Sequence, residues 1–159
     1  YAMGCGMRVI YVDSHATAEA IDVEIGGHHV RVPVKMVTLP ELLAQADAIT
    51  LHVPAQKDGR PVIGAAELAK MKAGAVIVNT ARGGSIDEEA LLKALQEGRI
   101  RGAALDVFVG EPEPHEGLMA DPNLSLTPHI GAATAEAQGR VGDELAEQII
   151  SWRSTVDVS

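Results

Sequence analysis

Short runs of aliphatic residues alternate along this chain with longer amphipathic stretches, and this alternation restricts the possible folds more than any other feature. An alternation of strands and helices is typical of α/β domains, in which helices pack against a parallel sheet. Only 3% of the residues are aromatic, so aliphatic side chains and alanine must build the core, as they do in buried parallel sheets. Strands are predicted at residues 8–12, 48–53, 75–79, 103–107 and 124–126. The sequence therefore predicts an α/β fold with a doubly wound parallel sheet.

Recognisable end signals bound the helices that are predicted between these strands. Thr38 is a candidate N-cap, and Glu41 stands where a capping box would be completed. A further helix begins with acidic residues and stops at Gly98, which suits the helix dipole and a left-handed C-terminal residue. The predicted helices are residues 39–46, 65–71, 87–97 and about 135–153, the last with an apolar stripe of Val141, Leu145, Ile149 and Trp152. A small hairpin is expected where residues 23–25 and 30–34 flank Gly26 and Gly27.

Charge and composition exclude several classes of function. The chain has 13 basic and 22 acidic residues, a formal net charge of −9, which argues against a surface for nucleic acid or for an anionic membrane. No apolar run approaches the roughly 18 residues that span a bilayer, and no signal-peptide pattern is present. The single cysteine, Cys5, cannot form an internal disulfide, and we expect it to be buried. A cytoplasmic protein without membrane contact is expected.

Polar residues follow the predicted strands at the places where open α/β sheets bind their ligands, beyond the carboxyl ends of the strands. Asp13 closes the first strand, and an acid there can accept hydrogen bonds from both hydroxyls of an adenosine ribose while it repels a 2′-phosphate. No Lys or Arg follows closely, so NAD is favoured over NADP. An ordinary turn or cap aspartate is the equally open alternative.

The segment NTARGG (79–84) is the strongest local signal in the chain. A buried strand delivers Arg82 at its carboxyl end, where the planar donors of the guanidinium suit a carboxylate. Gly83 and Gly84 are interpreted as positions where the backbone approaches a ligand closely. A structural arginine at the sheet edge is the alternative.

The segment TPHIG (127–131) offers a candidate acid–base. Pro128 fixes the backbone directly before His129, and a rigidly held histidine on a loop after a strand is suited to proton transfer. Asp106, which ends the preceding strand, and Glu111, which follows it in the loop, supply carboxylates that could orient the imidazole. Metal ligation is the competing interpretation, but no two His or Cys residues have a zinc-like spacing, so no metal is expected.

Taken together, these segments resemble the D-2-hydroxyacid dehydrogenases. The resembling segments are GMRVIYVD (6–13), LHVP (51–54), MKAGAVIVNTARGGSIDEEALLKAL (71–95), GAALDVFVGEP (102–112) and LTPHIGAATAEAQ (126–138). The resemblance implies a Rossmann-type NAD-binding domain and hydride transfer between nicotinamide and a small-molecule D-2-hydroxyacid or 2-oxoacid. Within the family the resemblance is greatest to the enzymes of serine biosynthesis that act on 3-phosphoglycerate and 3-phosphohydroxypyruvate.

The resemblance also implies a role for each matching residue. Arg82 would bind the substrate carboxylate and the 2-oxo oxygen, His129 would exchange a proton with the C2 oxygen, and Glu111 would be the carboxylate partner of the histidine. Contacts with the cofactor are expected from Asp13, His52, Val53, Pro54, Thr80, Ala81, Arg82, Asp106, His129 and Gly131.

Two parts of the family's pattern have no counterpart in the sequence. There is no G-x-G-x-x-G phosphate loop, and the Gly4-Cys5-Gly6 segment precedes a strand, which makes it a helix stop. We therefore expect residues 1–159 to be the C-terminal portion of the NAD-binding domain, without the substrate-binding domain. The first strand of the Rossmann sheet would be absent, the strands that flank it would lack a common partner, and this portion alone would show little turnover.

Two further expectations concern the class of function and the assembly. A non-enzymatic NAD-sensing scaffold, like the corepressors built on this fold, is the alternative to an enzyme, since such proteins can retain the catalytic residues. The family resemblance also implies a homodimer that forms mainly through the cofactor domain.

Overall fold

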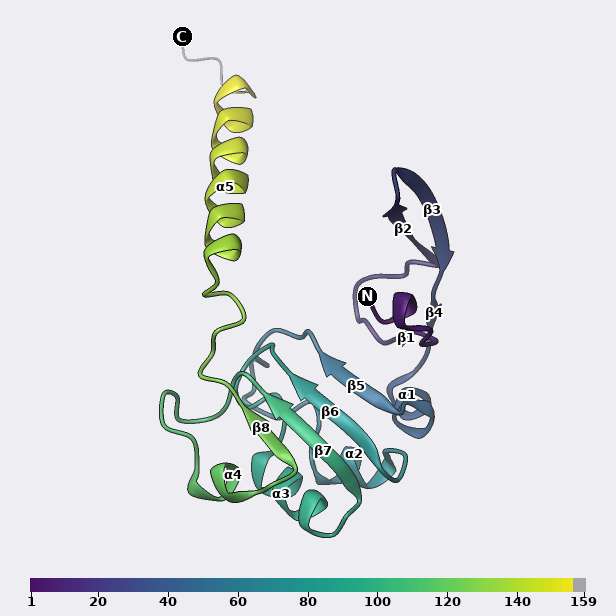
Figure 1. The fold of residues 1–159 in the computed structure, drawn as a ribbon, viewed down its shortest axis with the longest axis vertical. Helices are drawn as coiled ribbons and strands as arrows, with labels where there is room; N and C mark the ends of the chain where they lie inside the picture. Colours follow the sequence, from purple (N-terminus) through teal and green to yellow (C-terminus); the bar gives the residue numbers. More distant parts are fainter. Residues whose placement is uncertain (156–159) are drawn as a thin grey trace.

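The largest sheet of the molecule is parallel and has four strands (Figure 1). The computed structural model describes residues 1–155. The strands of this sheet, in spatial order, are β5 (Ala48–Leu51), β6 (Ala75–Asn79), β7 (Ile100–Leu105) and β8 (Leu124–Leu126). Each is joined to the next by a segment that contains a helix or, between β7 and β8, a short helix and a long loop. The predicted α/β fold with a parallel sheet is confirmed.

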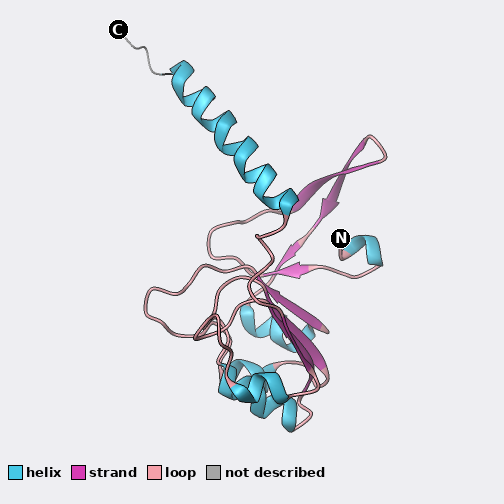
Figure 2. Ribbon diagram, turned by 60° about the vertical axis from the view of Figure 1, so that its left-hand side comes forward, coloured by secondary structure: helices cyan, strands magenta, loops and turns pink. Residues whose placement is uncertain are grey.

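Helices cover one face of this sheet and form the core with it (Figure 2). They are α1 (Leu39–Gln45), α2 (Ala65–Lys70), α3 (Glu88–Gln96) and α4 (Glu116–Ala120). Leu43, Leu68, Leu91 and Leu118, one from each helix, are fully buried and belong to the same apolar cluster as the strand residue Ile77. Burying a side chain of this size contributes about 1.5–3 kcal/mol, so this cluster anchors the loops at the ends of the strands.

The second face of the sheet carries smaller side chains and is more open. Val76 and Val78 of β6 and Ala104 of β7 are only partly buried. They line a cleft of about 340 Å³ that continues to Pro122 and Ser125. A sheet wound on both sides would carry helices here as well, but α1 to α4 all contribute to the core on the first face.

Two smaller sheets precede the large one in the chain. β1 (Ile10–Tyr11) pairs in parallel with β4 (Lys35–Met36), and β2 (Ala20–Ile25) forms an antiparallel hairpin with β3 (His28–Pro33). Gly26 and Gly27 have φ values of 58° and 79°, as a two-residue type I′ turn requires. The pair β1–β4 shares no ladder with β5. This agrees with the expectation that the two groups of strands lack a common partner strand.

Several bounds differ from the sequence prediction. The first strand is limited to two residues because β4, its only ladder partner among the described residues, is equally short. β7 begins three residues earlier than predicted, and α4 was not predicted from the sequence. The capping box of Thr38 and Glu41 is present as predicted.

The expectation that Cys5 is buried is wrong. The residue ends a 3-10 turn, η1 (Met3–Cys5), that contains no buried residue, and its thiol is exposed. Gly6 does stop this turn, with φ 77° and an N–H that donates to the Met3 carbonyl. The turn lies at the edge of the small β1–β4 unit (Figure 1), where no core element covers it.

The last helix, α5 (Ala135–Thr155), stands away from the sheet (Figure 1). Its predicted apolar stripe is exposed, with Val141, Leu145, Ile149 and Trp152 each more than half accessible to solvent. Across residues 1–155, none of the helices combines the length and the apolar character that crossing a membrane would demand.

Candidate active site

The four parallel strands of the large sheet end at a common edge, and the predicted site residues lie in the loops that leave it. His52, Val53 and Pro54 follow β5, and Thr80 to Arg82 follow β6. The loops after β7 and β8 carry Asp106, Glu111 and His129. Parallel pairing places the carboxyl ends of these strands side by side, which brings residues distant in sequence together.

Glu111 and His129 form a hydrogen-bonded pair. The Nδ1 of His129 lies 2.7 Å from Glu111 Oε2, and the other carboxylate oxygen, Oε1, accepts the Phe108 N–H at 3.0 Å. The hydrogen bond with His129 is the main reason that the pKa of Glu111 lies below its usual value, and the Phe108 N–H lowers it further. A carboxylate that stays charged makes Nδ1 the donor, so Nε2 is left to exchange a proton. The imidazole is 45% exposed and accessible to a substrate.

The backbone of His129 has an unusual conformation, with φ 55°. A residue other than glycine pays about 1–2 kcal/mol for the left-handed region, so neighbouring contacts must hold it. The His129 N–H donates to the Thr127 carbonyl at 3.0 Å. The next two amides, of Ile130 and Gly131, donate to Asp106.

Asp106 anchors the loop of residues 127–131, which carries His129 and is called the histidine loop below. The residue is only 6% exposed. Its Oδ1 accepts the Thr127 hydroxyl at 2.6 Å and the Ile130 N–H at 2.9 Å, while Oδ2 accepts the Gly131 N–H at 2.8 Å. Burial raises the pKa of Asp106, but the three hydrogen bonds together outweigh it and leave the pKa below its usual value. A Cβ on Gly131 would lie 2.9 Å from Oδ2, so a larger residue at this position would have to displace the buried carboxylate.

Asn79 shapes the turn that presents Arg82. Its side chain is 2% exposed, accepts the Ala81 N–H at 3.0 Å and donates to the Arg82 carbonyl at 2.9 Å. The guanidinium of Arg82 donates to the Ala81 carbonyl at 2.6 Å. Within residues 1–155 it forms no ion pair, so its charge is available to an anion.

Gly83 has a structural role that the sequence analysis did not foresee. A Cβ at this position would lie 2.3 Å from the carbonyl oxygen of Phe108, a distance that real Cβ atoms do not reach. The glycine therefore lets the Arg82 loop pack directly on the backbone of the loop that carries Glu111. The close approach of the backbone at this glycine is thus a contact within the protein, and the approach to a ligand stays a prediction.

Glu88, which the sequence analysis also left out, reaches the same loop from the first turn of α3. Its Oε1 accepts the Val109 N–H at 2.7 Å. Partial burial raises the pKa of Glu88, and the Val109 N–H offsets only part of this effect. In the sequence, the acidic residues at the start of α3 indicate only a favourable interaction with the helix dipole, and nothing local distinguishes Glu88 from its neighbour Glu89.

Asp13 and His52, two of the predicted cofactor contacts, form hydrogen bonds with residues close to them in sequence. The Oδ1 of Asp13 accepts the N–H groups of His15 and Ala16 at 2.7 and 2.9 Å, and the Ala16 N–H is the largest cause of its lowered pKa. The turn role is thus real, and Oδ2 remains for a ligand. His52 Nε2 lies 3.0 Å from the Thr50 hydroxyl. No hydrogen bond among the described residues links Asp13 with the catalytic candidates.

The two remaining predicted contacts with the cofactor lie beside Arg82: Thr80 is exposed and Ala81 is buried.

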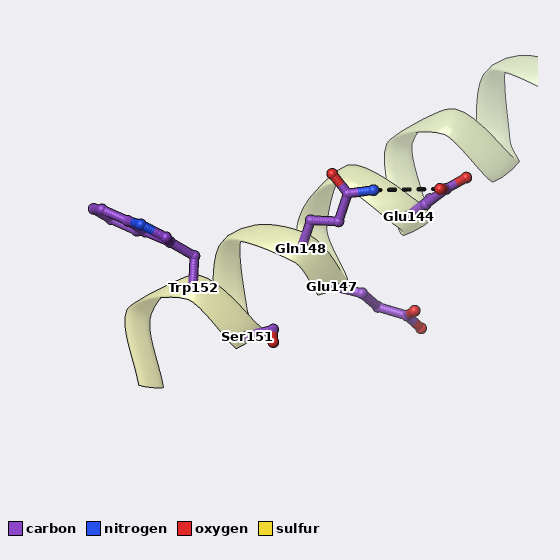
Figure 3. A pocket seen from close by; sticks show the side chains of 5 residues that line it. All are labelled: Glu144, Glu147, Gln148, Ser151 and Trp152. Atoms are coloured by element: carbon purple, nitrogen blue, oxygen red, sulfur yellow. Dashed lines mark hydrogen bonds between the residues drawn. The ribbon is translucent and has the colours of Figure 1, made fainter. Parts of the chain in front are cut away.

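A shallow depression of about 490 Å³ lies elsewhere, among Glu144, Glu147, Gln148, Ser151 and Trp152 (Figure 3). All five residues project from α5, so this depression holds none of the predicted site residues. No group of three or more potential metal ligands gathers within residues 1–155.

Comparisons with known proteins identify the family to which the sequence is similar. The sequence model of the family described as "D-isomer specific 2-hydroxyacid dehydrogenase, NAD binding domain" matches residues 1–131. A hydroxypyruvate reductase of Thermotoga maritima is 50% identical over 121 residues, 74% of this chain and 40% of that protein. A D-3-phosphoglycerate dehydrogenase of Methanocaldococcus jannaschii is 45% identical over 151 residues, 93% of this chain and 27% of that protein.

The fold is shared with solved structures. One is an NADPH-dependent glyoxylate/hydroxypyruvate reductase of Sinorhizobium meliloti, solved with NADP and malonate. It matches with a TM-score of 0.76 and 28% identity, over 96% of this chain and 44% of that one. The chain thus spans less than half the length of each of these relatives.

Proposed function

The chain belongs to the D-isomer specific 2-hydroxyacid dehydrogenases, and from this membership we propose that the intact protein transfers a hydride between nicotinamide and a D-2-hydroxyacid. The observation that carries the proposal is the 2.7 Å contact of Glu111 with His129, at the sheet edge where the guanidinium of Arg82 forms no ion pair with any of residues 1–155. Residues 1–159 would be the C-terminal portion of the NAD-binding domain, and the substrate-binding domain would lie outside them.

The three side chains match what oxidation of a secondary alcohol demands. The alcohol must lose a hydride from carbon, which the bound nicotinamide accepts, and a proton from oxygen. His129 Nε2 takes the proton, and Glu111 holds the imidazole in the correct tautomer and stabilises the imidazolium. Arg82 binds the substrate carboxylate and polarises the forming carbonyl. In the reverse direction His129 returns the proton to the carbonyl oxygen.

The residues present fit a dinucleotide cofactor, and we propose NAD. Asp13 stands at the end of β1 with one carboxylate oxygen held by backbone amides and the other open, as the acceptor of an adenosine ribose would be. Its negative charge opposes a 2′-phosphate, and Ser14, His15 and Ala16 follow it in place of Lys or Arg. We expect Asp13→Ala to reduce the preference for NADH over NADPH at least tenfold in kcat/KM, whereas an unchanged preference would contradict this role.

For the substrate we propose 3-phosphoglycerate and 3-phosphohydroxypyruvate. The support is the resemblance of the segments DEEALLKAL (87–95) and GAATAEAQ (131–138) and the 45% identity to the phosphoglycerate dehydrogenase. The comparable identity to a hydroxypyruvate reductase makes hydroxypyruvate the competing substrate. The homodimer and the cytoplasmic location stay predictions from the sequence.

The deciding assay follows NADH oxidation by the intact protein with a panel of 2-oxoacids that includes 3-phosphohydroxypyruvate, hydroxypyruvate, glyoxylate and pyruvate. We expect turnover with at least one acid, and loss of it in His129→Ala with the affinity for NADH changed by no more than a few fold. Failure with every acid despite measurable NADH binding would refute the enzyme and favour a non-enzymatic NAD-sensing scaffold.

A further inference from the structure

We propose that Glu88 is a positioning residue for the catalytic pair, which it holds in place through the backbone of Val109. The inference deepens the proposed function and rests on it, because it assigns a residue of α3 to the proton-transfer step. Glu88 lies within the resembling segment of residues 71–95, but it is not among the residues for which the resemblance implies a role.

Two consecutive amides in the loop after β7 donate to carboxylates. The Phe108 N–H donates to Glu111 Oε1 at 3.0 Å, and the Val109 N–H donates to Glu88 Oε1 at 2.7 Å. Each amide is thus held by a different carboxylate. The first bond connects the loop to the base-orienting Glu111, and the second connects the same stretch of backbone to a helix.

That helix is a firm support. Leu91, Ala94 and Leu95 of α3 are buried in the core, and Asp87 caps its N-terminus by accepting the Ala90 N–H at 3.0 Å. Glu88 is the first residue of the helix, so its backbone is fixed by this packing. A hydrogen bond from such a support restricts the loop far more than one from another exposed loop would.

The position of the loop then determines the position of the imidazole. Glu111 lies two residues beyond Val109, and its Oε2 meets His129 Nδ1 at 2.7 Å. The distance between a general base and its partner must be maintained closely, because small displacements of reacting groups reduce rates strongly. Glu88 is therefore connected to the imidazole of His129 through its hydrogen bond with Val109, the backbone from Val109 to Glu111, and the hydrogen bond of Glu111 with Nδ1.

The surroundings of Glu88 separate this role from a purely electrostatic one. Asp87, Glu111 and His115 are the charged or titratable groups that act on it. Because Glu88 and Glu111 are both negative, the charge of Glu88 by itself disfavours ionisation of Glu111. Loss of the charge and loss of the positioning contact therefore change the pKa of Glu111 in opposite directions.

The experiment compares the intact protein with its Glu88→Ala, Glu88→Gln and Glu89→Ala variants. Glutamine keeps an oxygen acceptor for the Val109 N–H without the charge, and Glu89 is the exposed acidic neighbour in the same helical turn. The pKa of Glu111 is followed by NMR of 13C-labelled glutamate carboxyls, with the signal assigned by Glu111→Gln. Steady-state kinetics with the best 2-oxoacid are measured in parallel.

We expect Glu88→Ala to raise the pKa of Glu111 toward its ordinary value of 4.5 and to lower kcat roughly 10- to 100-fold, part of what general acid–base catalysis contributes. KM should change less than threefold. Glu88→Gln should restore most of kcat and keep the pKa low, and Glu89→Ala should match the wild type in both.

Two results would overturn the proposal. A fall in the Glu111 pKa in Glu88→Ala would show that Glu88 acts only through its charge. An unchanged pKa and kcat would show that the packing of Phe108 on Gly83 holds the loop without Glu88. The NMR result does not depend on turnover, so a failure of the proposed function leaves this test intact.

Discussion

Replacing Asp106 with asparagine changes one carboxylate oxygen into an NH2 group and so removes one acceptor from the histidine loop. The carboxylate accepts three hydrogen bonds, two at Oδ1 and one at Oδ2. An amide has one oxygen and one NH2 group, so in either orientation the NH2 must face a backbone N–H. The orientation that loses least places the amide oxygen at Oδ1 and turns the NH2 toward the Gly131 N–H.

The magnitude follows from those contacts. One hydrogen bond to a charged acceptor is lost, worth about 1.5–3 kcal/mol, and the two that remain become neutral and weaker. The site is only 6% exposed, so water cannot readily replace the missing acceptor. We expect the loop to open more easily by about 2–4 kcal/mol, which corresponds to a roughly 30- to 1,000-fold loss of protection for its amides.

The assay is hydrogen exchange of the Ile130 and Gly131 amides, measured under conditions in which exchange reports the opening equilibrium. Asp58→Asn is the matched control, because Asp58 is exposed and accepts the Arg60 N–H in a surface turn. The control should leave both amides at their wild-type rates. Wild-type protection of these amides in Asp106→Asn would refute the conclusion that Asp106 anchors the loop.

Two other perturbations test the packing and the charges of the site. Gly83→Ala places a Cβ 2.3 Å from the Phe108 carbonyl oxygen and should destabilise the protein by about 1–3 kcal/mol in urea unfolding, whereas Gly142→Ala, with open space around it, should be neutral or slightly stabilising. Equal midpoints for the two variants would contradict the close contact. The pKa values of Asp106 and Glu111 are lowered in the folded state, so their contribution is complete above the unfolded values of about 4 and is lost as the pH falls through the folded ones. The urea concentration at the unfolding midpoint should therefore decrease as the pH is lowered below about 4, and this decrease should be less steep in Asp106→Asn. An identical dependence on acid pH in that variant would count against the sign of the Asp106 pKa shift.

The elements of the fold could be predicted from the sequence to a large extent because their signals are local. The aliphatic runs of β6 and β8, the capping box of Thr38 and the glycine stop after α3 involve residues within a few positions of one another. Periodicity and capping act over that range. The placement of Arg82, Glu111 and His129 at the ends of successive strands follows from the same signals, since parallel strands deliver their carboxyl ends to one edge.

Contacts across longer separations were decided by the tertiary structure alone. Asp106 lies 21 to 25 residues from the groups it binds, and Glu88 lies 21 residues from Val109. The packing of helices and loops determines which acidic side chain accepts a hydrogen bond from which amide. No short-range sequence pattern predicts these pairings. Gly83 was recognised as a position of close approach, but only the structure shows that its neighbour is the Phe108 carbonyl.

The sequence by itself thus determined the class of fold and which candidate side chains stand at the ends of the strands, because local propensity and the parallel arrangement of strands dictate both. The tertiary structure decided how those side chains are held: Asp106 beneath the His129 loop, Gly83 against Phe108, and Glu88 on Val109. It also decided that Cys5 and the apolar stripe of α5 are exposed, since burial depends on which surfaces meet and hydrophobicity alone does not specify that.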